Sequence, residues 1–206
     1  GPLDAIVKGR AIDALTIVPQ NPGGAWSPKK IMDMLDWVKK NYPCDSTRVY
    51  VLGMSLGGYG TMDVCATYPD RIAAGMALCG GCSLKDVSGL GDLPFWIIHG
   101  TADRAVPIKK SKVVVEQLKQ EGKDSRLIYD WWKGANHGTP ARVFYLKKTY
   151  EWLFSHSLRD KNRPVNKDIS ISMSDLRKAY GDMTKDTAQP ELIDGLSIIN
   201  AESNEY

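Results

Sequence analysis

Residues 53–57 read Gly-Met-Ser-Leu-Gly and place Ser55 at the centre of the pattern G-x-S-x-G. The pattern directly follows an apolar run and directly precedes a segment of helical character that extends to about residue 68. A serine on such a tight strand-to-helix turn is held in a strained conformation. Glycines on either side of it, Gly53 and Gly57, are expected to remove side chains that would collide with the backbone. The pattern therefore predicts that Ser55 is a nucleophile.

The same turn places Ser55 at the N-terminus of a helix, where the helix dipole favours negative charge on an oxygen atom. The backbone N–H of Leu56 is expected to donate to the oxyanion that forms when the serine attacks a carbonyl group. A glycine-rich turn can instead hold a phosphate. That alternative fits poorly, because the segment lacks Gly-Lys-Ser/Thr and the glycine spacing is not G-x-G-x-x-G.

A serine hydroxyl becomes an effective nucleophile when a base takes its proton and an acid orients that base. After a nucleophile turn of this kind, the acid and then the base follow in the chain, each in a loop at the carboxyl end of a strand. Asp103 lies in such a loop, between the apolar run 95–98 and Pro107. His137 lies in the next one, after an apolar run that ends at Trp131. We therefore expect Asp103 to be the acid and His137 the base.

Other acidic and histidine residues fit these roles less well. Asp92 precedes its predicted strand, at the opposite end of the sheet, and Asp130 lies inside a strand. His99 ends a strand, where its ring is expected to pack in the structure, and His156 falls at the close of the last predicted helix. The order and the loop placement together favour the acid and base chosen above.

The elements that must position these residues are predicted from apolar patterns. Five nearly continuous apolar runs are expected to form strands, at residues 14–19, 48–52, 73–79, 94–99 and 126–131. Helical patterns lie between them, and three of these begin at Ser27-Pro28, at Pro107 and at Thr139-Pro140, the last running to about residue 155. Such alternation indicates an α/β fold, with a mostly parallel sheet covered by helices on both faces.

The chain is expected to contain a catalytic domain over residues 1–157 and a polar extension over 158–206. A short helix is predicted near residues 174–180 of the extension. The remainder of the extension is expected to wrap the outside of the sheet in part and to fray at its end.

Composition excludes several classes of function. The net charge is only +3 over 206 residues, and the lysines form short clusters typical of solvated helix faces, so no nucleic-acid partner is expected. No apolar run approaches the roughly 20 residues of a membrane span. Cys79 and Cys82 have C-x-x-C spacing, but no second such pair completes a zinc site. A disulfide between them remains open, and neither a metal nor an organic cofactor is expected.

The sequence resembles the α/β-hydrolase superfamily. Within that superfamily it is similar to polyhydroxybutyrate-depolymerase-like, feruloyl and acetyl-xylan esterases and to phospholipase/carboxylesterases. The resemblance covers roughly residues 1–157 and is carried by Val-Pro-Gln-Asn at 18–21, the segment 45–60 around Gly-Met-Ser-Leu-Gly, Tyr-Pro-Asp-Arg at 68–71, His-Gly-x-x-Asp-x-x-Val-Pro at 99–107 and Asn-His-Gly at 136–138.

The resemblance implies a serine ester hydrolase with Ser55, Asp103 and His137 as its triad and the Leu56 amide as an oxyanion donor. It implies an acyl-enzyme intermediate, no cofactor, acetyl or feruloyl esters of polysaccharides as substrates, and a secreted or periplasmic location. A serine peptidase with the same triad is an alternative. The oligomeric state stays open.

Members of this superfamily have earlier strands, one of which ends in a His-Gly motif whose loop supplies a second oxyanion amide. Only one strand and one helix are expected before the strand that leads into Ser55, and no such motif precedes it, so the chain is expected to be shortened at its front. This departure favours, as a further alternative, a catalytically impaired domain that binds carbohydrate or a partner protein. Trp26, Trp131 and Trp132 are expected either to line the substrate pocket or to pack in the core.

Overall fold

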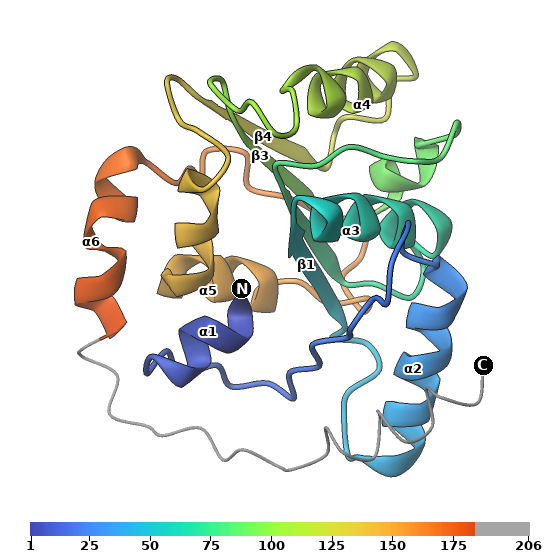
Figure 1. Ribbon diagram of the computed structural model, residues 1–206. Helices are drawn as coiled ribbons and strands as arrows, with labels where there is room; N and C mark the ends of the chain where they lie inside the picture. Colours follow the sequence, from blue (N-terminus) through green and yellow to red (C-terminus); the bar gives the residue numbers. More distant parts are fainter. Residues whose placement is uncertain (184–206) are drawn as a thin grey trace.

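The computed structural model describes residues 1–183 and is built on one four-stranded parallel sheet (Figure 1). The strands are β1 (Tyr50–Met54), β2 (Ala74–Leu78), β3 (Phe95–Gly100) and β4 (Leu127–Trp132). They pair in chain order, β1-β2-β3-β4, so each strand lies beside the next one along the chain. Four of the five predicted strands are confirmed, with ends that differ by one or two residues.

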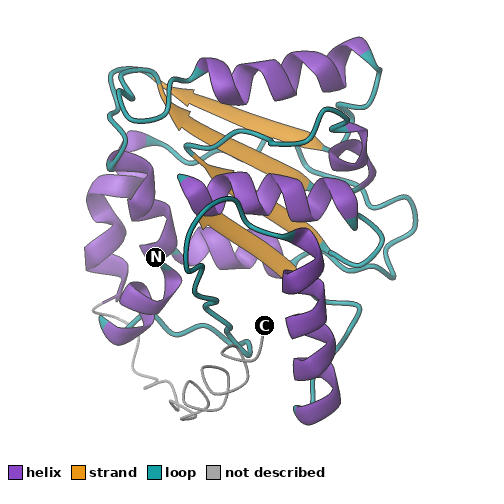
Figure 2. Ribbon diagram, turned by 45° about the vertical axis from the view of Figure 1, so that its right-hand side comes forward, coloured by secondary structure: helices purple, strands orange, loops and turns teal. Residues whose placement is uncertain are grey.

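Helices cover both faces of this sheet (Figure 2). They are α1 (Pro2–Val7), α2 (Pro28–Asn41), α3 (Leu56–Thr67), α4 (Lys109–Gln120), α5 (Lys147–Phe154) and α6 (Met173–Met183), with 3-10 segments η1 (Ser88–Asp92) and η2 (Thr139–Tyr145). The predicted α/β class, with a parallel sheet between two helical layers, is confirmed.

Alternating side chains of the strands divide the core into two layers. On β3, Phe95 and Ile97 pack with residues of α2, α3 and α4, whereas Trp96 and Ile98 pack with residues of η2, α5 and α6. All six residues of β3 are buried, as are all five of β2. A parallel sheet buried on both faces needs apolar residues on both, which explains the nearly continuous apolar runs in the sequence.

One predicted helix start is confirmed in detail. Ser27 caps α2, because its hydroxyl oxygen accepts a hydrogen bond from the Lys30 amide, and Pro28 is the first helical residue. Gly122 follows the last turn of α4 with φ of +65°, a left-handed conformation that suits glycine.

The predicted strand at residues 14–19 was wrong. This segment has no regular secondary structure, and Leu15 and Val18 are 44% and 39% exposed. It does not pair with β1, so its backbone gains no ladder of hydrogen bonds. The apolar run therefore contributes to a groove rather than to the sheet.

The predicted helix over residues 139–155 is two separate elements, η2 and α5. The chain is extended between them at Leu146, with φ of −82° and ψ of 129°. Side chains bridge the break: the Thr149 hydroxyl donates at 2.6 Å to Val143 O, which also accepts from the Leu146 amide, and the Tyr150 hydroxyl donates to Phe144 O at 2.6 Å. These bonds satisfy carbonyl groups that a continuous helix would have used.

The segment after residue 157 packs against the sheet rather than only covering its surface. Ile171, Leu176 and Ala179 are buried in the core layer on the α5 side, and the Trp132 indole N–H donates to Ile171 O at 3.1 Å. The helix predicted near residues 174–180 is present as α6. The part of the predicted extension from residue 184 onward lies outside the described residues.

Arg163 ties this segment to the amino ends of β2 and β3. Its guanidinium donates to the carbonyl groups of Pro69, Ile72, Ala73 and Asp92. These carbonyls precede the strands and have no place in the ladder of the sheet, so the arginine supplies donors that the backbone does not.

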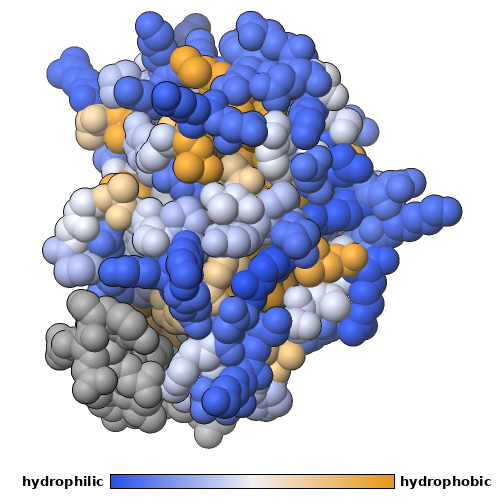
Figure 3. Space-filling view, turned by 90° about the vertical axis from the view of Figure 1, so that its right-hand side faces the viewer, coloured by the Kyte–Doolittle hydropathy of each residue, from blue (hydrophilic) through white to orange (hydrophobic). Residues whose placement is uncertain are grey.

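The molecular surface drawn in Figure 3 is mostly hydrophilic, and hydrophobic side chains show there only in small separate areas. Within residues 1–183, no helix is both long enough and apolar enough to cross a membrane.

Replacing Arg163 by methionine is expected to lower the free energy of unfolding by roughly 1–3 kcal/mol, because buried carbonyl groups lose their donors. Urea denaturation of the two chains measures the difference. Arg159→Met is the matched control, since the Arg159 side chain is 73% exposed and its contact with Asp45 is long, at 3.6 Å. Equal effects of the two substitutions would contradict a capping role for Arg163.

Candidate active site

Ser55 occupies the turn between β1 and α3 in a strained conformation, with φ of 58° and ψ of −119°. Its amide donates to Leu78 O at 2.9 Å, and its carbonyl accepts from the Tyr59 amide at 3.0 Å. Its hydroxyl makes no capping bond to α3. The predicted strained strand-to-helix turn is therefore present, and the backbone alone holds it, which leaves the side-chain oxygen uncommitted to the helix.

The two glycines that flank Ser55 differ in what they permit. A Cβ atom on Gly53 would lie 2.3 Å from Gly57 O and 2.8 Å from the Thr61 hydroxyl oxygen, so a side chain there collides with the helix. A Cβ atom on Gly57 would meet nothing within 4 Å. The expectation that both glycines relieve a collision is correct for Gly53 and wrong for Gly57.

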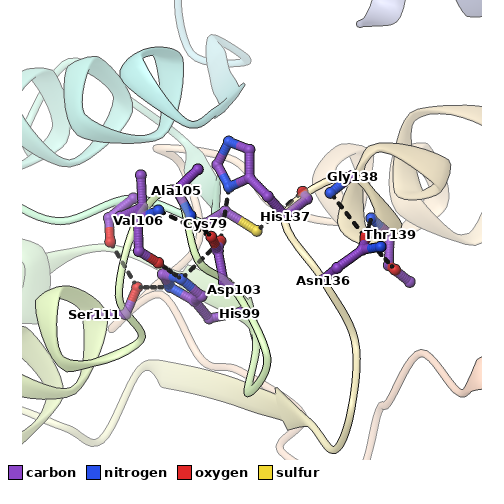
Figure 4. Close-up of polar contacts among 11 residues, drawn as sticks. Cys79, His99, Asp103, Ala105, Val106, Ser111, Asn136, His137, Gly138 and Thr139 are labelled. Atoms are coloured by element: carbon purple, nitrogen blue, oxygen red, sulfur yellow. Dashed lines mark hydrogen bonds and ion pairs between the residues drawn. The ribbon is translucent and has the colours of Figure 1, made fainter.

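Asp103 lies in the loop after β3 with its carboxylate fully buried. Oδ1 accepts hydrogen bonds from the amides of Ala105 and Val106, each at 2.9 Å, and Oδ2 accepts from His137 Nδ1 at 2.7 Å (Figure 4). Burial opposes the charge, but the bonds from His137 and from the two amides outweigh it and hold the pKa of Asp103 below its ordinary value. The carboxylate is therefore ionised and aimed at the imidazole.

His137 lies in the loop after β4, which two contacts hold in place. The Asn136 side-chain oxygen accepts from the amides of Gly138 and Thr139, and the Cys79 thiol donates to His137 O at 3.7 Å. The ring is 28% exposed and stands over Asp103, with its second nitrogen directed away from the carboxylate (Figure 4). The bond to Asp103 commits Nδ1, so Nε2 is the nitrogen free to exchange a proton.

The structure brings the predicted acid and base into direct contact and places the predicted nucleophile at the same edge of the sheet. Ser55, Asp103 and His137 follow β1, β3 and β4, whose carboxyl ends share that edge. Within residues 1–183, no hydrogen bond joins the Ser55 hydroxyl to His137. Such bonds are often loose in ligand-free structures and shorten when substrate binds.

Leu56 is the first residue of α3 and is 49% exposed. The amides in the first turn of a helix have no partner within the helix, so the Leu56 N–H is available to a group bound near Ser55. This is the placement predicted for an oxyanion donor.

The alternative acids and bases lie in other environments. Asp130 accepts a bond from the Trp96 indole at 2.7 Å, and Asp92 lies 3.8 Å from Lys123 at the amino end of the sheet. His156 is buried at the end of α5, with its ring edge-on to Trp152. None of these side chains contacts the Asp103–His137 pair within the described part of the chain.

The three tryptophans do not gather around that pair. Trp132 is a core residue, 6% exposed and bonded to Ile171 O, so its placement fits packing rather than substrate contact. Trp131 packs toward the opposite core layer and against Tyr129. Trp26 contacts Gly60 of α3 and lines a groove of about 590 Å³ between residues 12–19, α2 and β1. Ser55, Asp103 and His137 are not part of that groove's lining.

Cys79 is a neighbour of the acid and base that the sequence did not single out for the site. It directly follows β2 with φ of +49°, and its sulfur, Asp103 and His137 offer ligand atoms within 4.8 Å of one another. Its position at the end of a predicted strand, the same kind of position that Ser55 has, could have predicted that it lies near the site. Burial raises the pKa of the Cys79 thiol to about 12, so it stays protonated.

These properties favour proton transfer over metal binding at this cluster. Oδ2 of Asp103 and Nδ1 of His137 are already bonded to each other, and a metal needs the thiolate form of cysteine. Cys79 and Cys82 are free thiols, and the Cys82 sulfur instead lies 3.2 Å from Asp63 Oδ1.

Comparison with known proteins places this geometry in a class. No family model matches the chain. The chain is 38% identical over 81 residues to a probable acetylxylan esterase A of Aspergillus flavus and 38% identical over 80 residues to acetylxylan esterase A of Emericella nidulans. These segments are 38% and 37% of this chain and 26% of each relative. It is also 43% identical over 51 residues, 25% of this chain and 12% of the relative, to poly(3-hydroxyalkanoate) depolymerase C of Paucimonas lemoignei.

Solved structures give the same result for the fold. A thermostable esterase superposes with a TM-score of 0.57 at 28% identity, over 63% of this chain and 36% of that one. The acylaminoacyl peptidase of Pyrococcus horikoshii superposes with a TM-score of 0.53 at 17% identity, over 68% of this chain and 29% of that one.

The sheet, the helical layers and the strained serine turn define the α/β-hydrolase fold. Within that class, the resemblance to esterases predicted from the sequence is confirmed by the relatives and by the esterase structure. The chain spans about a quarter of the length of the acetylxylan esterases that it matches.

Alanine substitutions at the two flanking glycines are expected to have opposite effects. Gly53→Ala should destabilise the fold by roughly 1–3 kcal/mol, because the new methyl group meets backbone that cannot move aside. Gly57→Ala should leave stability unchanged or raise it by up to about 1 kcal/mol, because alanine favours helix over glycine and the space is open. Thermal unfolding of both variants beside the native chain checks this, and similar losses in both would contradict it.

Proposed function

We propose that the chain is a carboxylic-ester hydrolase in which Ser55 is the nucleophile, His137 the base and Asp103 the acid that orients the base. The observation that carries the proposal is the 2.7 Å bond between His137 Nδ1 and the buried Asp103 carboxylate, formed at the sheet edge where the strained Ser55 turn lies. The similarity to acetylxylan esterases supports it independently.

The reaction proceeds in two steps. His137 Nε2 takes the hydroxyl proton while Ser55 Oγ forms a bond to the ester carbonyl carbon. The resulting imidazolium returns its proton to the alcohol as the ester C–O bond breaks, which leaves an acyl group on the serine. Water then gives a proton to His137 and attacks the acyl carbon, and the carboxylic acid leaves as the Ser55 hydroxyl is restored.

Two features of the site stabilise charge along this path. The ionised Asp103 carboxylate stabilises the imidazolium and keeps Nε2 oriented away from itself. The Leu56 amide and the positive end of the α3 dipole favour the negative charge that develops on the carbonyl oxygen.

The substrate that the relatives suggest is an acetyl ester carried by a polysaccharide. Acetylxylan esterases of two fungi are each 38% identical to this chain over about 80 residues. A feruloyl ester is the other candidate within the same class. The solvent-exposed face of the His137 ring fits a substrate whose bulk stays outside the protein.

The test of this proposal is hydrolysis of p-nitrophenyl acetate by the native chain and by Ser55→Ala. The variant is expected to lose at least about a thousandfold in rate, because removing one triad member removes the concerted proton transfer. Ser125→Ala is the matched control, since this exposed serine precedes β4 at the other end of the sheet and should leave the rate unchanged. Covalent labelling of Ser55 by a fluorophosphonate provides a second readout.

Two further substrates then separate the alternatives. Release of acetate from acetylated xylan, with no cleavage of a chromogenic peptide, is the expected result. Cleavage of the peptide alone would replace the esterase by a serine peptidase. Equal background release from native and Ser55→Ala chains, with no fluorophosphonate labelling of a folded sample, would overturn the proposal in favour of a binding domain.

A further inference from the structure

His99, the fifth residue of β3, lies directly beside the acid of the proposed triad. The side chains of His99 and Asp103 are both completely buried, and His99 Nε2 lies 3.2 Å from Asp103 Oδ2. The same nitrogen lies 2.8 Å from Val106 O. A carboxylate oxygen and a carbonyl oxygen can only accept hydrogen bonds, so Nε2 of His99 must carry a hydrogen.

This contact falls on the carboxylate oxygen that faces the base. Oδ1 of Asp103 is occupied by two backbone amides, whereas Oδ2 lies between His137 Nδ1 at 2.7 Å and His99 Nε2 at 3.2 Å. The two imidazole rings therefore share one acceptor. Figure 4 shows this arrangement, with His99 on the inner side of Asp103 and His137 on the outer side.

The other nitrogen of His99 connects the site to two further elements. Nδ1 lies 2.7 Å from the hydroxyl oxygen of Ser111, in the first turn of α4, and that oxygen lies 2.8 Å from Gly80 O, just after β2. The Ser111 hydroxyl has a single hydrogen, so it serves either Nδ1 or the carbonyl at one time. The ring is held from both sides, and its orientation toward Asp103 is fixed by packing and bonding together.

The charge state of His99 follows from its surroundings. Burial lowers the pKa of His99, and this outweighs the opposing effects of Val106 O and of the Asp103 carboxylate. Near neutral pH the ring is therefore uncharged and donates through Nε2. A neutral donor supports the carboxylate without neutralising the charge that the base requires.

We propose that His99 is a positioning residue, whose Nε2–H fixes the Asp103 loop and limits how tightly Asp103 Oδ2 holds the proton on His137. The proposal rests on the triad proposed above. It goes beyond it, because His99 touches neither the substrate nor the base and acts through the acid.

An apolar side chain could fill the same buried space, but Val106 O would then lose its hydrogen-bond donor, and Asp103 Oδ2 would keep only the bond from His137 Nδ1. The carboxylate oxygen would then be a stronger acceptor for the remaining N–H, that of His137. The proton on His137 would be held more tightly, and a higher pH would be needed to free Nε2 as a base. A purely structural role for His99 predicts no such change.

Substitutions at His99 can separate its two nitrogens. The amide nitrogen of Gln extends about as far as Nε2, so His99→Gln keeps a donor toward Asp103. The shorter His99→Asn reaches only the Ser111 side, and His99→Leu removes both contacts. His156→Gln is the matched control, because His156 is also buried but lies at the end of α5, away from Asp103.

The first measurement is the pH–rate profile of p-nitrophenyl acetate hydrolysis, with thermal unfolding recorded for each chain. His99→Leu and His99→Asn are expected to lower kcat roughly tenfold or more, with little change in KM, and to move the acid limb of the profile to higher pH. His99→Gln should recover most of kcat and the native limb, and His156→Gln should change neither. Equal profiles for Gln and Leu, or a loss of rate without a shifted limb, would overturn the proposal.

The second measurement needs no activity. The chain has three histidines, so the ring signals of His137 can be assigned by substitution and titrated by NMR in a Ser55→Ala background. The His137 titration midpoint is expected to rise in His99→Leu and to stay near native in His99→Gln. An unchanged or lowered midpoint in His99→Leu would overturn the proposal.

The two measurements also distinguish failure of this proposal from failure of the proposed function. Absence of Ser55-dependent hydrolysis would contradict the esterase proposal, while the NMR titration would still report on His99. Where His99→Leu does not fold, Ser111→Ala takes its place, because it frees Nδ1 and loosens the ring. A smaller shift in the same direction is then expected, and no shift would overturn the proposal.

Discussion

Parallel pairing in chain order is the constraint on which the rest of the molecule depends. Because β1, β2, β3 and β4 run side by side in one direction, the residues that follow them meet at one edge. The register is held by burial on both faces, since a slip of one residue would exchange the two core layers. This pairing alone brings to that edge four residues that are far apart in the sequence: Ser55, Cys79, Asp103 and His137.

The sequence was sufficient where function depends on local chain geometry. The strained turn at Ser55 requires a strand before it, a residue without a side chain at Gly53 and a helix after it. Each of these can be recognised in the sequence close to Ser55. The acid and the base were found by their positions after apolar runs, and the structure joins them by a hydrogen bond. Their catalytic roles, and that of Ser55, remain proposals that the enzyme assays test.

Features that depend on distant partners could not be predicted in this way. Residues 14–19 have the composition of a strand, but strand formation needs a neighbour that pairs with them. The break at Leu146 depends on side-chain bonds from Thr149 and Tyr150, which no helical pattern reports. His99 was expected only to pack, because its contact with the inner side of Asp103 exists only once the loop has folded back over β3.

The position of Arg163 has a consequence for the order in which the domain is made. Its guanidinium donates hydrogen bonds to carbonyl groups at the amino end of β2, and these groups precede Arg163 by 90 to 94 positions in the chain. At ribosomal rates of about 5–20 residues per second, those carbonyl groups wait roughly 5 to 20 seconds for their donor. All four strands have already been synthesised by then. Pairing of these carbonyl groups in the cell therefore waits for translation of the segment behind the sheet.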